Sequence, residues 1–189
     1  MRHTLLLFLI GFYFNAHSQS EHEKLEGNLN SSANEAAPIL SPDGQTLYFV
    51  RQYHPRNVGG VTDPGDIWYS DLQADGQWGE ATHGGKTINN RFYNGIVGFV
   101  DDQTAYVHGH YLGGNKKPTT QGMSMTSGQK DQWNTPEAVK IPYFYSKSKH
   151  QSGSLHSSGQ IMLTALQSYD SRGAEDLYVL FRQSDDSWS

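Results

Sequence analysis

The stretch Ser41-Pro42-Asp43-Gly44, followed by Gln45-Thr46-Leu47-Tyr48-Phe49-Val50, decides the fold. Proline presets its φ angle, aspartate hydrogen-bonds its own backbone, and glycine takes the positive φ of a tight turn. The residues after the turn are mostly apolar, aromatic or β-branched, which favours a strand. Residues 37–40 supply the strand before it, so the stretch predicts a β-hairpin.

This hairpin belongs to a unit that occurs three times. Trp78, Trp133 and Trp188 stand at equal intervals of 55 residues, and an aspartate lies within three residues before each. A short strand is predicted upstream of each tryptophan, at residues 66–70, 122–126 and 176–180. A strand-rich unit repeated every ~55 residues is typical of β-propeller blades. The alternative is an ordinary β-sandwich in which the spacing agrees by chance.

The first unit also resembles a known family of blades. Ser41-Pro42-Asp43-Gly44 with Asp66-Ile67-Trp68-Tyr69 and Gly76-Gln77-Trp78-Gly79 is similar to the TolB-type, WD-repeat-like β-propeller. The second unit departs from that pattern at Val100-Asp101-Asp102-Gln103, and the third keeps only part of it. The resemblance covers about residues 34–189. It implies an all-β fold of about three four-stranded antiparallel blades, with bounds near 34–90, 91–145 and 146–189.

The N-terminal residues have a different character. Met1-Arg2-His3 carries positive charge, residues 4–14 are almost all apolar, and Ala16-His17-Ser18 supplies small residues. This order predicts a signal peptide over residues 1–18, followed by a flexible polar linker over 19–33. The apolar run is too short to cross a bilayer core of about 30 Å. We therefore expect an exported protein, periplasmic or associated with the outer membrane, without a transmembrane segment; a buried N-terminal strand or helix is the alternative.

Composition narrows the classes of partner and cofactor. The chain has no cysteine, which excludes disulfides, and a formal net charge of −5 that is spread along the sequence. Nothing resembles the basic patch that phosphate contacts need, so nucleic acid is not an expected partner. No cofactor motif is present in the sequence.

No catalytic motif is evident either. Gly122-Met123-Ser124-Met125-Thr126 lacks the second glycine of a nucleophile elbow. Asp101 and Asp102 are adjacent in a predicted turn, where aspartate commonly makes local hydrogen bonds. His108 and His110 would share one face of a strand and are weak candidates for a metal site, although no third ligand is evident. The alternative is a pair of loop histidines at a polar edge.

The loops between the second and third strands of each unit are expected to share one face of the molecule. They carry residue types that recognise protein or glycan surfaces. The candidate binding residues are Tyr53, His54, Arg56, Asn57, His110, Tyr111, Lys116, Lys117, Tyr169 and Arg172. The aromatic and basic connection at residues 143–149 either adds to this face or packs between blades. Solvated loops without a partner are the alternative.

These features suggest a non-enzymatic interaction or scaffold module of the cell envelope. The alternative, from the same resemblance, is the substrate-gating propeller part of a prolyl-oligopeptidase-like hydrolase whose catalytic domain lies outside these residues. Closed propellers have roughly four to eight blades. Three blades therefore predict either part of a longer protein or a homo-oligomer that closes by self-association.

Overall fold

A computed structural model describes residues 24–25, 29–111 and 119–189 of the chain. The predicted signal peptide, most of the predicted linker, and Lys116 and Lys117 lie outside these residues. The described part is all-β, which confirms the predicted class, with one short 3-10 turn, η1 (Gly60–Thr62). None of the described residues forms a helix with the length and apolar character of a membrane span.

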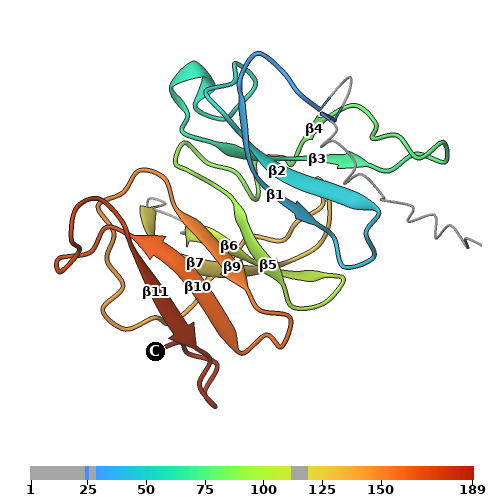
Figure 1. The fold of residues 1–189 in the computed structure, drawn as a ribbon. Coiled ribbons are helices and arrows are strands. Elements are labelled where there is room, and N and C mark those ends of the chain that lie inside the picture. The colour runs from blue at the N-terminus through green and yellow to red at the C-terminus, as the bar shows by residue number, and fades with distance from the viewer. Residues whose placement is uncertain (1–23, 26–28, 112–118) are drawn as a thin grey trace, which may run out of the picture.

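The strands form three antiparallel sheets, each built from consecutive strands (Figure 1). The first sheet contains β1 (Asn34–Leu40), β2 (Thr46–Gln52), β3 (Asp66–Asp71) and β4 (Thr82–His83). The second contains β5 (Ile96–Phe99), β6 (Thr104–His110), β7 (Thr119–Ser127) and β8 (Glu137–Ala138). The third has three strands rather than the predicted four, and they are β9 (Ser152–Leu155), β10 (Ile161–Leu166) and β11 (Asp176–Phe181). The leading strands of successive sheets are in contact, β1 with β5 and β5 with β9.

The predicted hairpin joins β1 to β2. Ser41 donates its backbone N–H to the Thr46 carbonyl oxygen at 2.8 Å, and Gly44 takes a φ of 70°. The Asp43 carboxylate accepts the Gln45 N–H at 3.0 Å, the local bond expected of aspartate in a turn. The other two sheets begin with corresponding hairpins, each closed by one backbone bond across the turn, from Val100 to Thr104 and from His156 to Ile161.

Successive sheets pack through opposite faces, which we call forward and rear. The forward face of the first sheet, with Tyr48, Ile67 and Tyr69, packs on the rear face of the second, with Ala105 and Val107. The same relation recurs one sheet later. The forward residues Val97, Tyr106 and Met123 of the second sheet pack on the rear residues Met162 and Leu180 of the third.

The periodic tryptophans belong to these interfaces. Trp133 of the second sheet meets Tyr48 of the first, with ring centroids 5.9 Å apart, and Trp188 of the third sheet meets Tyr106 of the second at 5.6 Å. Trp78 occupies the corresponding rear position of the first sheet. Each tryptophan therefore fills the rear side of its own sheet, which explains the constant interval in the sequence.

The rear face of the first sheet is covered by the chain itself. Leu29 is buried there with Leu47, Phe49 and Trp68. Its carbonyl oxygen accepts a bond from Arg51 Nη2 at 2.7 Å. Leu29 falls in the segment predicted as a flexible linker, and this contact was not anticipated. The physical reason is that a leucine in a mostly polar stretch lies beside an apolar sheet face and is buried against it.

Gly98 marks the closest approach between the second and third sheets. A Cβ atom at this position would stand 2.3 Å from Leu155 Cβ, which is closer than real contacts allow. Gly98→Ala should therefore lower the free energy of unfolding by about 1–3 kcal/mol, measured by urea denaturation. The double variant with Leu155→Gly, which removes the clashing Cβ atom, should recover part of this loss relative to Leu155→Gly alone. Additive losses would contradict a clash between these two positions.

Candidate binding surface at the loop edge

The longer loops gather at one edge of the sheets, which we call the loop edge. In a meander of antiparallel strands, alternate connections lie at opposite edges. The β2–β3 loop and the β4–β5 connection accordingly meet, because Asn94 donates its N–H to the Gly65 carbonyl oxygen at 2.7 Å. Likewise Lys147, in the β8–β9 connection, donates to Gln167 of the β10–β11 loop at 2.8 Å. The tight turns lie at the other edge.

An exposed group at the loop edge, which we call the tyrosine platform, consists of Tyr145, Lys147 and Tyr169. The two tyrosine rings are stacked, with centroids 4.0 Å apart and planes inclined by 8°. Lys147 Nζ lies 5.7 Å from the Tyr169 ring centroid, within cation–π range. Tyr169 is 77% exposed even in this stack. The β8–β9 connection and the β10–β11 loop therefore present a pre-ordered aromatic and cationic group to solvent.

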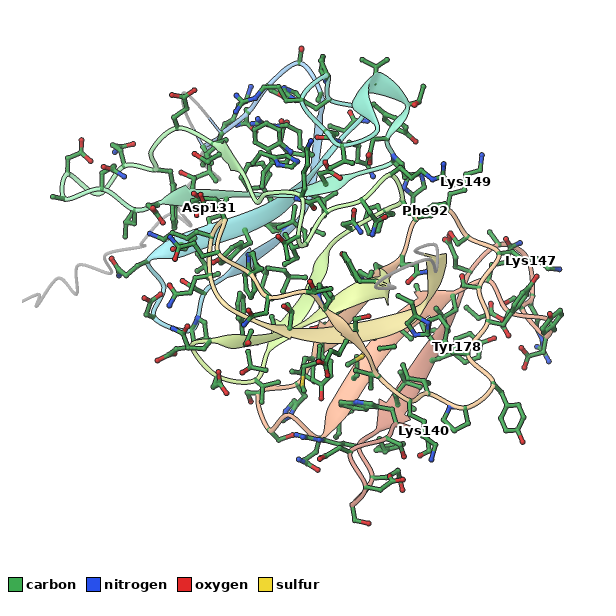
Figure 2. All side chains as sticks on the ribbon, turned by 180° about the vertical axis from the view of Figure 1, so that it is seen from behind. Phe92, Asp131, Lys140, Lys147, Lys149 and Tyr178 are labelled. Carbon is green, nitrogen blue, oxygen red and sulfur yellow. The ribbon has the colours of Figure 1, made fainter. Side chains whose placement is uncertain are left out.

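The two segments that carry the platform are tied together. Besides the bond from the Lys147 N–H, the Ser148 hydroxyl bonds the Glu175 carboxylate across the same pair of segments. Tyr143, four residues before Lys147, is fully exposed. In Figure 2, Lys147 and Lys149 project from one side of the molecule. Residues 143–149 were predicted either to pack between blades or to add to the binding face. Both occur, because Phe144 packs between sheets whereas Tyr145 and Lys147 lie at the loop edge.

Charges are distributed unevenly between the two edges. The cations of the loop edge, none of which takes part in an ion pair within the described ranges, are Arg56, Arg91, Lys147, Lys149 and Arg172. The turn edge carries the acidic residues Asp43, Asp75, Asp101, Asp102, Asp131, Asp185 and Asp186. Asp131 accordingly lies on the side of the molecule opposite Lys147 in Figure 2. The loop edge also holds the acids Asp170, Glu175 and Asp176, which accept hydrogen bonds from uncharged donors, and the five cations outnumber these three acids.

Of the four candidate binding residues in the β2–β3 loop, some lie at the surface and others are held in contacts within the protein. Tyr53 is exposed, and its hydroxyl lies 3.4 Å from His150 Nε2 of the third unit. His54 and Arg56 pack on the buried Trp68 ring, at 4.8 and 5.0 Å, and Arg56 remains exposed. Asn57 is buried, donates to the Arg51 carbonyl oxygen and accepts the Trp68 Nε1 hydrogen. The assignment of Asn57 to the binding face is therefore wrong, because its side-chain amide is buried and hydrogen-bonded within the protein.

Tyr111 is a second correction. It is buried, and its hydroxyl donates to the Ile88 carbonyl oxygen at 2.6 Å while accepting from Asn94 at 2.8 Å. Burial raises the pKa of its hydroxyl far above the usual range. Tyr111 joins the β4–β5 connection to the second sheet and does not face solvent. Tyr169 and Arg172, by contrast, lie exposed as predicted.

His108 and His110 do not form a metal centre with other described residues. The described part of the chain contains no group of three or more metal-ligating side chains. A register shift separates the two histidines in the β6–β7 ladder, and Gly109 between them has a φ of 85°, so the regular alternation that the prediction assumed is broken. His108 is buried on the forward face of the second sheet, where burial lowers its pKa to about 4. His110 is half-buried.

Comparison with known proteins adds no identification. No protein-family model matches the chain, and no curated protein matches it significantly. Function is therefore inferred from the residues and their geometry.

Proposed function

We propose that this chain is an exported, non-catalytic binding module of the bacterial envelope, built from three β-propeller-type blades. Three features support this proposal. Each sheet is an antiparallel meander of consecutive strands, successive sheets pack forward face on rear face, and the sequence begins with the three-part pattern of a signal peptide. In such a stack the faces of the sheets are used for packing against one another, and the loops at the edges of the stack remain available to bind a partner.

The partner is proposed to be a protein that presents an acidic surface to the loop edge. The tyrosine platform is the observation that carries this proposal. Tyrosines with a neighbouring cation are frequent anchors of protein interfaces, because they bury a large area at little cost in conformational entropy. The unpaired cations around the platform favour acidic partners.

The residues that most resemble catalytic groups have structural roles. Ser124 is fully buried, and its hydroxyl donates to the Gly109 carbonyl oxygen at 2.8 Å. Asp101 lies in an exposed turn and accepts the Gln103 N–H at 2.8 Å. That bond lowers the pKa of Asp101, which keeps the carboxyl group ionised rather than prepared to donate a proton. These contacts support a binding role.

A photo-crosslinking experiment in the producing organism tests this function. We expect a p-benzoylphenylalanine residue at position 169 to form a discrete protein adduct in the envelope fraction. The same residue at position 75, in an exposed turn of the opposite edge, serves as the control and should form none. Lys147→Glu should reduce the adduct at position 169 at least several-fold, because it reverses one charge of the platform.

Three results would contradict the proposal of a protein partner at this site. Equal adducts at positions 169 and 75 would indicate non-selective contact. No adduct at position 169 would show that the platform does not meet a protein partner. Recovery of a glycan in place of a protein would transfer the site to the second class of envelope partner.

A further inference from the structure

The forward face of the third sheet is apolar and uncovered. Leu163 is 54% exposed and Leu177 86%, and their strands pair so that Leu163 lies opposite Val179. The side chains on this face, none of them charged, are Ser152, Ser154, Ile161, Leu163, Ala165, Leu177, Val179 and Phe181. A continuous uncharged sheet face of this kind usually marks an interaction surface.

The central positions of this face, Leu163 and Leu177, are buried in the other two sheets, whereas the positions of Val179 and Phe181 are exposed at Met125 and Ser127 of the second sheet. Leu163 corresponds in strand register to Tyr48 and Tyr106, which are both almost fully buried against the next sheet. Leu177 corresponds to Ile67 and Met123, and both are also buried. The forward face of the third sheet therefore has the character of an interior surface whose covering sheet is supplied from elsewhere.

We propose that this face docks on the rear face of the first sheet in a second copy of the chain. The inference rests on the blade architecture proposed above. Within the chain, a forward face packs on a rear face twice, and the contact includes a residue at the Tyr48 position against a tryptophan of the next sheet. In the dimer, Leu163 of one copy takes this place beside Trp78 of the other. Two such contacts related by a two-fold axis close a ring of six sheets.

The chain also contains a competitor for this contact. The rear face of the first sheet is covered by Leu29, yet the cover is incomplete. A cavity of about 180 Å³ remains there, lined by Leu25, Leu29, Asn30, Glu35, Ala36, Pro38, Leu47 and Phe49. Docking of a second copy requires the Leu29 segment to move aside, and also the His54 and Arg56 side chains where they cover the Trp68 ring. The segment is thus an intramolecular cap that weakens self-association without abolishing it.

Sedimentation velocity on residues 19–189 tests the proposal with two charge variants. Leu177→Glu places a charge on the forward face, and Trp78→Glu places one on the rear face. The wild type should dimerise, and each variant alone should dimerise at least ten-fold more weakly. An equimolar mixture of the two variants should form more dimer than either variant alone, because one of the two contacts then joins an unaltered forward face to an unaltered rear face. Leu29→Ser should strengthen dimerisation by weakening the cap.

The results of this experiment distinguish forward-on-rear docking from other arrangements of two copies. A wild type that stays monomeric at all concentrations overturns the proposal. So does normal dimerisation of Trp78→Glu alone, because this result indicates contact between two forward faces. Pro38→Glu, an exposed site beside the same cavity, replaces Trp78→Glu if circular dichroism shows that the latter unfolds. Leu177→Glu leaves the tyrosine platform intact, so the adduct at position 169 reports on the proposed function independently.

Discussion

Trp188→Ala is expected to lower the free energy of unfolding by about 3–5 kcal/mol, the range observed for truncation of a buried tryptophan. Trp188 is fully buried between the second and third sheets and meets Tyr106 edge to face, with the planes inclined by 87°. Its removal leaves a cavity bordered by Met162 and Leu180 of its own sheet. Urea denaturation followed by circular dichroism provides the measurement.

Trp188→Phe is the matched control. The Trp188 indole N–H has no hydrogen-bond partner among the described residues, so phenylalanine sacrifices volume but no polar contact. We expect it to cost less than half as much as alanine. Equal losses for the two variants would indicate that the indole N–H, rather than apolar packing, holds the interface between the second and third sheets.

The stability of the protein should fall as the pH drops from about 6.5 to 4. Burial of His108 lowers its pKa from 6.5 to about 4 in the folded state. In this window the unfolded chain binds the proton and the folded chain does not, so the free energy of unfolding decreases with falling pH. The full difference is about 3 kcal/mol at 1.4 kcal/mol per pKa unit. Above pH 6.5 this contribution is constant, and below pH 4 it is lost completely.

His108→Val isolates this contribution. Valine is the residue at the corresponding position of the first sheet, Val50, which is also buried on a forward face. Unfolding midpoints in urea should be compared between pH 7.5 and 4. We expect a much smaller decrease for the variant than for the wild type. Equal decreases would mean that His108 is not the group that couples stability to pH.

Local turn chemistry and the tryptophan interval were sufficient to predict an all-β chain with three antiparallel sheets, although the third sheet has three strands instead of four. The Ser41–Gly44 turn forms the first hairpin, and Trp133 and Trp188 fill equivalent places between sheets. The turn is a short-range pattern and the tryptophan interval is strictly periodic, so both can be recognised in the sequence without a structure. The strand positions followed from the same alternation of apolar residues.

The corrected site residues depended on contacts between distant parts of the chain. Asn57 is held by Trp68, and Tyr111 by Ile88, so each polar group serves the scaffold. Their residue types are equally frequent at binding surfaces and in buried hydrogen-bond networks, and no local pattern distinguishes the two. Leu29 was assigned to a flexible linker because most of its neighbours in the sequence are polar, so its packing on the first sheet was missed.

The tyrosine platform was only partly foreseeable. Tyr169 was among the predicted loop residues, and the aromatic run at residues 143–145 gave a signal that had two interpretations. The stack between Tyr145 and Tyr169 requires the β8–β9 connection to run beside the β10–β11 loop. That pairing is set by the order of the strands in the third sheet, which a linear pattern of residue types does not reveal.

The central claim is that sheet faces assemble the molecule while the loop edge stays free for a partner. Hydroxyl-radical footprinting at low and high protein concentration tests it most directly, because it reports the exposure of individual side chains. We predict that Leu163 and Leu177 become protected as concentration rises, whereas Tyr143 and Tyr169 remain reactive. Continued reactivity of Leu163 and Leu177, or protection of the two tyrosines with them, would contradict the claim.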